Sequence, residues 1–399
     1  MVQVDSQKIR EVLEKGVEEI IERESLERKM KSGQKLRIKL GIDPTGPKIH
    51  LGRAIQFWKL RQFQELGHQA VLIIGDFTAL IGDASDKTSM RRSLTEEEVK
   101  KNMKTYLKQI GLILDLKKTE IHYNSEWLGK LKLKDYLNLA MKFTAQQMIQ
   151  RRNFKERWEK GNPIGVHELA YPIMQGYDSV AVKADVEIGG SDQLFNLKTG
   201  REIQKIFGQA PQDVMTLKML YGLDGRKMST SWGNTVNITD SPAEMYGKIM
   251  SMNDELIGHY FELAAQCSPK EVEEVKKELK SKKVNPREIK ARLAKEIVRM
   301  YYGGKKAEKA EEEFNRVFRR KELPETMPFL KMQEKEIFLP RLLYLAGVAS
   351  SLKEAKRLVK AGAVEIDGQK EDEWKKSIKV KNGMVIKVGK RRFVRIKTN

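Results

Sequence analysis

The stretch Leu223-Asp-Gly-Arg-Lys-Met-Ser-Thr-Ser231 divides this chain into two parts with different hydrophobic patterns. Before it, short apolar runs alternate with amphipathic segments, whereas after it the pattern is helical and basic. The stretch itself is polar, and its Lys227 is flanked by Gly225, Ser229 and Thr230. Such a loop can close over a phosphate chain, because lysine supplies a point charge while hydroxyls and loop amides supply hydrogen bonds. Taken alone, the same composition would also suit a plain surface linker.

The part before this stretch predicts an alternating α/β domain. The unbroken apolar run Ala70–Ile74 holds three β-branched residues and predicts a buried strand. Further strands are predicted at Leu36–Leu40, near Ile121, and over Val180–Ile188 and Val214–Leu220. Helices are predicted over 6–31, 53–66, 95–114 (opened by a Thr95/Glu98 capping box), 133–151, 166–177 and 192–207, with a loop over 76–92. This alternation favours a parallel sheet with helices on both faces.

The part after Ser241-Pro242 predicts helices only, through about residue 318. A linker is expected over 319–336, which contains two prolines. Two short helices follow at 340–346 and 352–361, then strands at 364–366, 384–388 and 392–396, with Asn382-Gly383 as a hairpin turn. We therefore expect an α-helical domain and a small α+β domain after the α/β domain.

Composition restricts the function classes. A length of 399 residues suggests two or three domains, and a net charge of +21 favours a polyanion such as nucleic acid as partner. Residues 341–399 hold 16 Lys and Arg against 6 Asp and Glu, a net +10. The single cysteine, Cys267, excludes an intrachain disulfide and fits a reducing cytoplasm. There is no apolar signal core, and no apolar run approaches the roughly 18 residues of a membrane span.

Two turn passages are expected at the carboxyl ends of strands, where open parallel sheets bind ligands. In 41–52 a predicted strand stops and a helix begins, Gly52 permits close approach of a ligand, and His50 can donate to a phosphate oxygen. In 189–193 a second glycine turn opens a helix, and Asp192 can accept hydrogen bonds from ribose hydroxyls. Taken separately, each passage would also suit a plain turn with a surface histidine or a helix cap.

A third candidate is a polar stripe on one helix. Tyr171, Gln175 and Asp178 are spaced i, i+4, i+7, so they share one face of an otherwise apolar helix. Polar groups buried there need partners, which a small polar ligand could supply; the alternative is a solvated face. The sequence has no Ser-His-Asp or metal-ligand spacing and no GxxxxGK(S/T) motif, so we expect neither a metal site nor a P-loop.

Taken in order, these motifs resemble class I aminoacyl-tRNA synthetases, and specifically the bacterial-type tyrosyl-tRNA synthetases, over essentially the whole chain. His50-Leu-Gly-Arg53 is similar to the family's HIGH motif, and Lys227-Met-Ser-Thr-Ser231 to its KMSKS loop. Gly189-Gly-Ser-Asp-Gln193 is similar to the block before the adenosine-binding helix. The stripe of Tyr171, Gln175 and Asp178 resembles tyrosine rather than tryptophan recognition.

The resemblance implies a domain plan. It gives a Rossmann-type catalytic domain over 1–225, in which 112–165 would form a homodimer interface, and a loop and linker over 226–240. It also gives a helical anticodon-binding domain over 241–320. Residues 338–399 resemble the small RNA-binding fold named after ribosomal small-subunit protein four. The implied activity is that of a cytoplasmic tyrosine-tRNA ligase that uses ATP with Mg²⁺ and no tightly bound cofactor.

The resemblance also implies residue roles. Tyrosine would be bound by Lys39, Asp83, Tyr171, Gln175, Asp178 and Gln193. ATP would be bound by Gly41, Asp43, His50, Gly52, Arg53, Gly190, Asp192, Lys227 and Ser229. Catalysis would use Thr45, His50, Lys87, Arg91 and Lys227. The tRNA(Tyr) would be gripped by Lys353, Lys356, Arg357 and Lys360, which cluster on a basic helix face.

Three positions depart from the family pattern. Arg53 stands in place of the second motif histidine, and Thr230 in place of the second loop lysine. Lys39 stands where many bacterial members have a tyrosine, and it could pair with Asp178 or point away. Arg53 and Thr230 are the features that favour the alternative, a non-catalytic RNA-binding relative. A tryptophan-activating paralogue is a third reading, which the polar stripe disfavours.

Overall fold

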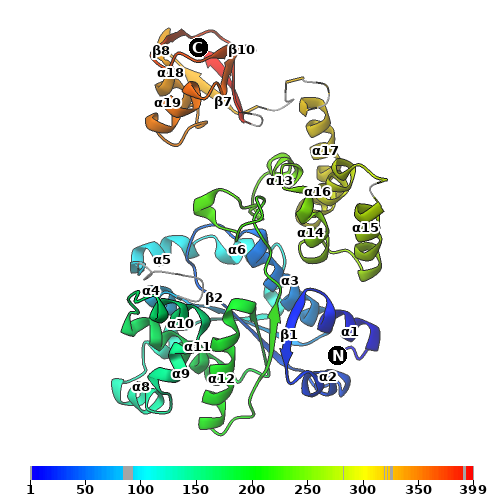
Figure 1. Ribbon diagram of the computed structural model, residues 1–399, viewed down its shortest axis with the longest axis vertical. Helices are drawn as coiled ribbons and strands as arrows, with labels where there is room; N and C mark the ends of the chain where they lie inside the picture. The colour runs from blue at the N-terminus through cyan, green and yellow to red at the C-terminus, as the bar shows by residue number, and fades with distance from the viewer. Residues whose placement is uncertain are drawn as a thin grey trace. The chain divides into compact units, whose positions relative to one another are not determined.

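The computed structural model describes residues 2–83, 93–281, 283–318, 320, 322–323, 327–389 and 392–398 (Figure 1). The chain forms two compact units, one of Met1–Asp240 with Lys248–Gly303, the other of Ser241–Gly247 with Gly304–Asn399. No helix within the described ranges is long and apolar enough to cross a membrane.

The first unit is built on a six-stranded sheet in the order β1-β6-β5-β2-β3-β4. The strands are β1 (Val17–Ile21), β2 (Arg37–Ile42), β3 (Gln69–Ile74), β4 (Thr119–Tyr123), β5 (Val186–Gly190) and β6 (Asp213–Leu217). Strands β2 to β6 are parallel, and β1 is an antiparallel edge strand on β6. The chain proceeds from β2 to β3 and β4 on one side and to β5 and β6 on the other. The switch point, where such sheets bind ligands, therefore lies between β2 and β5.

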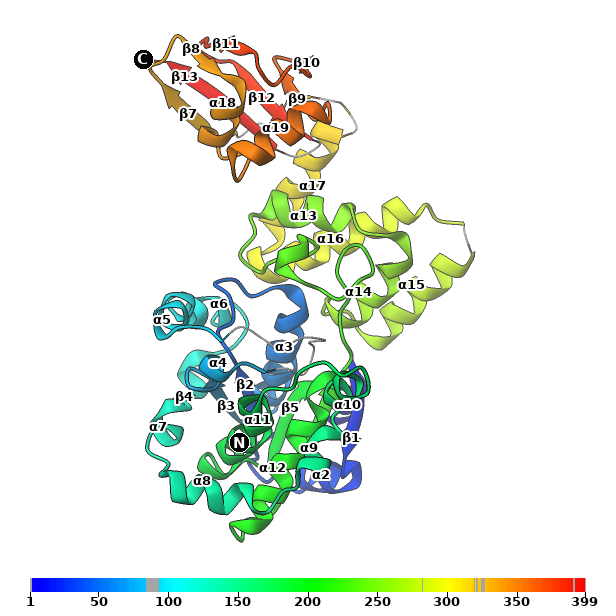
Figure 2. The ribbon, with the colours of Figure 1, turned by 60° about the vertical axis from the view of Figure 1, so that its left-hand side comes forward.

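Helices cover both faces of this sheet, as the alternating pattern predicted (Figure 1). Helix α3 (Leu51–Glu65) connects β2 to β3, and α12 (Leu194–Ile206) connects β5 to β6. These two crossovers run in opposite directions from the switch point, so right-handed connections put α3 and α12 on opposite faces. Helix α11 (Val166–Ala181) packs along α12 (Figure 2). The predicted α/β fold is confirmed.

The expected helix over 6–31 is wrong. The structure has α1 (Ser6–Glu14), the edge strand β1, and α2 (Arg23–Lys31). Gly16 and Glu22 both adopt left-handed backbone angles, φ +66° and 65°, and these interrupt the helix at each end of β1. The apolar residues of Val17–Ile21 follow helical spacing (17, 20 and 21), and pairing with β6 overrides that pattern in favour of the strand.

Other predicted boundaries also need correction. The expected strand over 180–188 is two elements, because Val180 still belongs to α11 and β5 begins only at Val186. The Thr95/Glu98 capping box is confirmed, but the helix it opens breaks into two, and so does the helix expected over 133–151. The capped helix divides into α5 (Glu96–Met103) and α6 (Tyr106–Ile110), and the helix expected over 133–151 divides into α8 (Leu133–Ala140) and α9 (Ala145–Ile149). A short helix, α4 (Thr78–Ile81), lies in the expected loop. Two further helices are α7 (Ser125–Leu128) and α10 (Arg152–Glu159).

The middle of the chain contains helices only, as predicted. They are α13 (Pro242–Met250), α14 (Ile257–Leu263), α15 (Pro269–Ser281), α16 (Pro286–Tyr302) and α17 (Gly304–Phe318). Asn285 caps α16 with its side chain, and proline stands at the first helical position, where its missing N–H costs nothing. The helical segment is shared between the two compact units, which divide within α13 and again between α16 and α17.

The C-terminal part of the second unit is α+β. Two helices, α18 (Leu339–Leu345) and α19 (Leu352–Lys360), pack on a core that includes Leu342, Val359 and Ile386. A five-stranded sheet has the order β10-β9-β12-β13-β7, and β11 pairs with β8. The strands are β7 (Phe329–Met332), β8 (Glu336–Phe338), β9 (Val364–Ile366), β10 (Gln369–Glu371), β11 (Ser377–Lys379), β12 (Val385–Val388) and β13 (Arg392–Thr398).

Two predictions for this part are wrong. The expected linker over 319–336 contains β7, which pairs in parallel with β13 and completes the sheet. Asn382-Gly383 forms a turn, with Gly383 at φ +83°, but not a hairpin. The strand before it pairs with β8, while the strand after it pairs with β9 and β13. The Asn-Gly signal therefore predicted the turn correctly, but it did not predict which strands pair with each other.

Candidate functional site

A cavity of about 460 Å³ lies at the switch point, beyond the carboxyl ends of β2 and β5. It is lined by fifteen of the residues proposed from sequence: Gly41, Asp43, Thr45, His50, Gly52, Arg53, Asp83, Tyr171, Gln175, Asp178, Gly190, Asp192, Gln193, Lys227 and Ser229. Lys39 does not line it, and Lys87 and Arg91 lie outside the described residues. Segments far apart in the sequence thus meet in one polar cavity.

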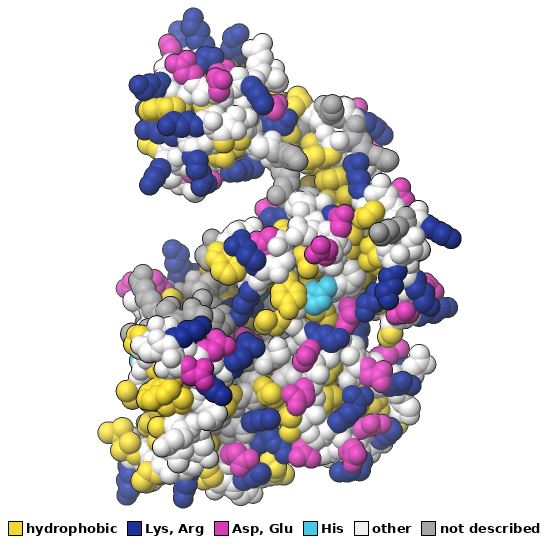
Figure 3. Space-filling model, viewed as in Figure 1, with side chains coloured by type: hydrophobic (Ala, Val, Ile, Leu, Met, Phe, Trp, Pro, Cys, Tyr) yellow, Lys and Arg dark blue, Asp and Glu magenta, His cyan; other side chains and the backbone are white. Residues whose placement is uncertain are grey.

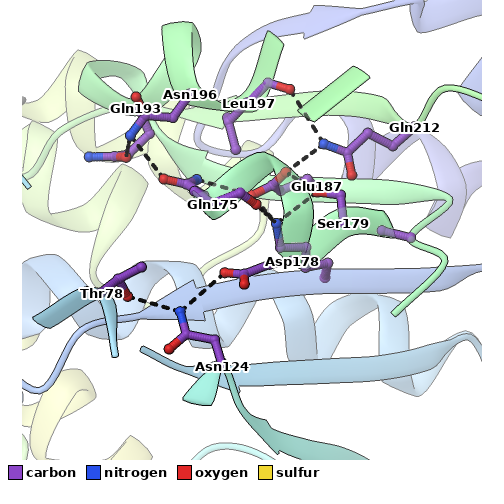
Figure 4. A network of polar contacts seen from close by, with 12 residues as sticks. Thr78, Asn124, Gln175, Asp178, Ser179, Glu187, Gln193, Asn196, Leu197 and Gln212 are labelled. Carbon is purple, nitrogen blue, oxygen red and sulfur yellow. Dashed lines mark hydrogen bonds and ion pairs between the residues drawn. The ribbon is translucent and has the colours of Figure 1, made fainter. Parts of the chain in front are cut away.

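Asp178 marks the buried end of this cavity. Its side chain projects from α11 and is 4% exposed. One carboxylate oxygen accepts a hydrogen bond from the Trp127 indole N–H at 2.7 Å. The other accepts from the Asn124 amide at 3.3 Å (Figure 4). Burial raises the pKa of Asp178 to about 7, against the opposing influence of Lys39 and the two donors. The arrangement holds a carboxylate ready to accept from a ligand hydroxyl.

A chain of hydrogen bonds links Asp178 to the nucleotide side of the cavity. Asn124 donates to the Thr78 hydroxyl at 2.9 Å, and Thr78 donates to Asp43 at 2.8 Å. The other oxygen of Asp43 accepts from the Tyr171 hydroxyl at 2.9 Å. Burial raises the pKa of Tyr171 well above its usual value, so the phenol remains a neutral donor. These hydrogen bonds fix the orientation of the side chains that they join.

A second group of polar contacts surrounds Asp83. One of its oxygens lies 2.6 Å from the Arg151 guanidinium, and the other accepts from Gln193 at 2.6 Å. Asn196 in turn donates to the amide oxygens of Gln193 and Gln175, both at 2.9 Å (Figure 4). Arg151 and Asn196 were not predicted from sequence: Arg151 belongs to a segment without a motif, and Asn196 stands three residues beyond the 189–193 turn.

Lys39 does not lie where a residue that contacts the substrate tyrosine was expected. It is fully buried, and its ammonium lies 2.9 Å from the Glu187 carboxylate, its partner in the parallel register of β2 and β5. It also donates to the Ser179 hydroxyl at 2.8 Å and to the Gln175 carbonyl at 2.9 Å. Lys39 therefore pairs with Glu187 rather than Asp178, and it faces the underside of α11 instead of the cavity.

The nucleotide side is formed by the start of α3. His50 caps this helix, and burial, with Arg53 and Lys227 adding to it, lowers its pKa to about 3. Its Nδ1 is buried and has no partner among the described residues. The Arg53 guanidinium, which stands in place of the second motif histidine, donates to the Thr45 hydroxyl and to Tyr106. A neutral imidazole with an unused ring nitrogen thus faces the cavity.

The glycine turn after β5 supplies the opposite wall. A Cβ at Gly190 would lie 2.6 Å from Asp192 Oδ1, so any larger residue would displace the Asp192 carboxylate from its present position. An oxygen of Asp192 lies 3.6 Å from the Lys227 ammonium. The polar loop therefore brings its lysine to the residue expected to bind ribose.

Asn234 braces that polar loop, which we define as residues 222–234 and call the signature loop. Its side-chain amide donates to Asp224 at 2.8 Å and to the Lys227 carbonyl at 3.1 Å. Its side-chain oxygen accepts from the Ser229 backbone N–H at 2.8 Å. One buried asparagine thus fixes three points of a loop in which Arg226, Thr230 and Trp232 are exposed. Sequence reasoning missed Asn234, as it missed Trp127 and Asn124.

The predicted RNA-binding cations come together on α19 in the second unit. Lys353, Lys356, Arg357 and Lys360 line a hollow with Trp374, which sequence reasoning did not single out.

Comparisons with known proteins cover both parts of the chain. A family model described as "tRNA synthetases class I (W and Y)" matches residues 30–319, and one described as "Tyrosine--tRNA ligase SYY-like C-terminal domain" matches residues 320–396. A tyrosine--tRNA ligase of Moorella thermoacetica is 47% identical over 392 residues, which cover 97% of this chain and 95% of the relative. That of Thermotoga maritima is 48% identical over 387 residues, 96% of each chain.

Solved structures share the fold at lower identity. A C-terminally truncated mitochondrial tyrosyl-tRNA synthetase of Aspergillus nidulans superposes with a TM-score of 0.64 at 21% identity, covering 78% of this chain and 94% of that one. A tyrosyl-tRNA synthetase of Archaeoglobus fulgidus, in complex with L-tyrosine, gives a TM-score of 0.63 at 24% identity, covering 77% of this chain and 99% of that one.

Proposed function

Because this chain belongs to the tyrosine-tRNA ligase family of the class I tRNA synthetases, we propose that the switch-point cavity is where L-tyrosine and ATP react. The enzyme activates L-tyrosine with ATP to tyrosyl-adenylate and pyrophosphate, then transfers tyrosine to the 3′ end of tRNA(Tyr). The observation that carries the residue assignments is Asp178, a buried carboxylate held by two donors at the closed end of the cavity.

The tyrosine side chain would enter toward Asp178 and donate its hydroxyl to that carboxylate. Trp127 and Asn124 hold the carboxylate in place, so the acceptor is preorganised. Phenylalanine would leave a buried acceptor unmatched, and this penalty gives the selectivity. We assign the ammonium and carboxylate of the substrate to the side chains expected from sequence at that end, Asp83, Tyr171, Gln175 and Gln193.

We assign Lys39 an indirect role. Its ammonium holds the Gln175 carbonyl and the Glu187 carboxylate, and Glu187 in turn accepts from the Gln175 side chain at 3.1 Å. The buried pair thus supports the α11 segment that carries the tyrosine-binding stripe. This replaces the expectation that Lys39 touches the substrate.

Adenylate formation requires positioning and charge stabilisation rather than a protein nucleophile. A carboxylate oxygen of tyrosine attacks the α-phosphorus of ATP, and the bond to pyrophosphate breaks. We propose that neutral His50 donates to a phosphate oxygen, together with the Thr45 hydroxyl, while Lys227 neutralises the developing negative charge. Lys87 and Arg91 would add further positive charge; they lie outside the described residues and stay a sequence-based proposal.

Mg²⁺ would enter as part of the nucleotide substrate. Among the residues with described positions there is no group of three or more His, Cys, Asp or Glu able to hold a metal ion. We propose that Mg²⁺ arrives bound to the ATP phosphates, because Mg²⁺ retains water and binds substrate phosphates in preference to an all-protein cage.

We propose separate tRNA contacts for the rest of the chain. The helical segment, about 241–320, would hold the anticodon, and the α+β part, 338–399, would grip the tRNA through its basic surface. The charge of that part, 16 Lys and Arg against 6 Asp and Glu over 341–399, supports a polyanionic partner. We propose a cytoplasmic location, where ATP and tRNA are available.

We further propose a homodimer formed through the segment 112–165. Leu133, Leu137 and Met141 follow one another at intervals of four residues along α8, and their exposed fractions are 72%, 50% and 73%. Figure 3 shows hydrophobic side chains gathered at this lower-left part of the surface. A contiguous apolar stripe of this kind is typical of an isologous interface. Leu137→Glu should halve the mass found by sedimentation, whereas Val4→Glu, at another exposed apolar residue, should leave it unchanged.

The function is tested by amino-acid-dependent ATP–pyrophosphate exchange with tyrosine, tryptophan and phenylalanine compared side by side. Exchange with tyrosine alone is expected. Exchange with tryptophan would contradict the role of Asp178, and exchange with none would indicate the non-catalytic RNA-binding relative.

A further inference from the structure

A partly buried tryptophan lies within a cluster of cations in the second unit. Trp374 stands between β10 and β11 and shares a hollow of about 360 Å³ with four basic residues of α19, Lys353, Lys356, Arg357 and Lys360. The Lys356 ammonium lies 4.5 Å from the indole centroid, and those of Lys360 and Lys375 lie at 5.9 and 5.7 Å. Three ammonium groups thus surround one aromatic ring.

Trp374 is anchored but not buried. Phe338 contacts it edge-on with centroids 6.2 Å apart, and the ring packs against the apolar core of this unit. Acidic residues are present on the same segments: Glu371 pairs with Lys376, Glu354 accepts from Ser350, and Asp372 and Glu373 precede Trp374 in the chain. Helix α19 nevertheless carries four cations and a single acidic residue, Glu354. The hollow therefore combines a fixed aromatic surface with an excess of positive charge.

We propose that Trp374 stacks an unpaired base of RNA while the α19 cations bind the phosphates that flank it. This inference rests on the proposed tRNA-binding role of this part of the chain and specifies its ligand as a single-stranded nucleotide. Every base has a π-face, so stacking on tryptophan needs no particular sequence. A continuous A-form duplex buries its base faces and can offer the hollow phosphates only.

The cation–π contacts fit this role. At an exposed site an ammonium over an aromatic ring is held weakly. A phosphate attracts the same lysine more strongly through a charge-assisted hydrogen bond. Lys356 and Lys360 can thus move from the ring to the backbone of the RNA, and the indole face becomes available for a base. The competing explanation is that the lysines merely cover Trp374 and that the surface binds duplex phosphates alone.

Two substitutions separate stacking from packing. Trp374→Leu retains an apolar group against the core but removes the π-face, whereas Trp374→Phe retains both. The full-length chain and each variant are titrated with a short oligouridylate, whose bases stack poorly on one another, and with an RNA duplex of matching length at the same ionic strength. Trp374→Leu should weaken oligouridylate binding about tenfold and leave duplex binding unchanged, while Trp374→Phe should stay close to the unmodified protein. Equal losses on both RNAs, or no loss on either, would overturn the stacking role.

A variant that removes positive charge distinguishes failure of the stacking proposal from failure of the proposed tRNA-binding role of 338–399. Lys356→Gln/Lys360→Gln should weaken both RNAs, because both present phosphates. If it weakens both while Trp374→Leu weakens neither, the surface binds RNA backbone and the stacking proposal is wrong. If the charge variant binds both RNAs as tightly as the unmodified protein, the α19 face does not bind RNA, and the proposed tRNA-binding role of 338–399 is wrong as well. Tyrosine-dependent pyrophosphate exchange should remain unchanged in every variant.

Discussion

The two ends of the catalytic cavity are built differently. Around Asp178 the charged and polar groups are buried and bonded to one another, and Lys39 and Glu187 beneath them are at most 1% exposed. In the signature loop the charged groups are accessible, and the Lys227 side chain is 39% exposed. Buried contacts are strong because the local dielectric is low, whereas exposed ones are weakened by water and salt. The proposed tyrosine end is thus fixed by the fold, whereas we propose that the loop gains its strength from the phosphates of ATP.

The largest effect should follow from breaking the buried pair. Lys39→Met would leave the Glu187 carboxylate buried without its cation, and we expect the free energy of unfolding to fall by about 3–5 kcal/mol. Urea unfolding followed by tryptophan fluorescence measures this loss. The double variant Lys39→Met/Glu187→Gln should recover much of it, because no buried charge then remains. A loss below about 1 kcal/mol in the single variant would show that the pair is not a support of the tyrosine end.

Removing the acceptor at the closed end should act on one substrate. Asp178→Asn replaces a carboxylate that accepts from the substrate phenol by an amide, and hydrogen bonds to charged groups contribute about 1.5–3 kcal/mol. We expect the KM for tyrosine in pyrophosphate exchange to rise about 10–100-fold and the KM for ATP to change little. Equal losses for tyrosine and ATP would contradict the assignment of Asp178 to the tyrosine end.

The pH dependence tests the same carboxylate without a substitution. Its pKa is raised by burial to about 7, so the carboxylate is lost as the pH falls below that value. kcat/KM for tyrosine should then fall by roughly tenfold per pH unit. Stability moves the other way, because a raised pKa favours the protonated folded state: its contribution is complete below the usual value near 4 and is lost as the pH rises through about 7. Both trends should be absent in Asp178→Asn.

The sequence revealed the elements with strong local signals. Ala70–Ile74 had to be a buried strand, and helical spacing alone placed Tyr171, Gln175 and Asp178 on one face. The partners of Asp178 were hidden, because Trp127 and Asn124 belong to a distant segment with no motif of its own.

The buried pair was within reach of sequence reasoning. Glu187 is the single charge of β5, and Lys39 stands inside β2, whose other charge, Arg37, is at its first residue. Charges inside such strands require each other if the strands are neighbours. The edge strand β1 could not be predicted from the sequence, because the spacing of its apolar residues fits a helix and only pairing with β6 makes the segment a strand.

A moderate effect on pyrophosphate exchange is expected from replacing Asn234, a buried residue that supports the signature loop. Asn234→Ala removes three hydrogen bonds, to Asp224, Lys227 and Ser229, and so releases the segment that carries the Lys227 ammonium. We expect kcat for pyrophosphate exchange to fall about tenfold with little change in the KM for tyrosine, since the tyrosine end is held independently. A rise in the KM for tyrosine of the size expected for Asp178→Asn would show that the two ends are not separately supported.

The smallest effect is expected from an exposed pair in the same loop. Arg226 contacts Asp224 at 2.6 Å and lies over the Trp232 ring at 4.7 Å, but its side chain is 59% exposed. Surface pairs of this kind contribute little, so Arg226→Gln should change kcat for pyrophosphate exchange by less than about twofold. This variant is the matched control for Asn234→Ala, because both remove contacts to Asp224 and differ in burial. A tenfold loss in Arg226→Gln would mean that exposed charge, rather than the buried asparagine, holds the loop in place.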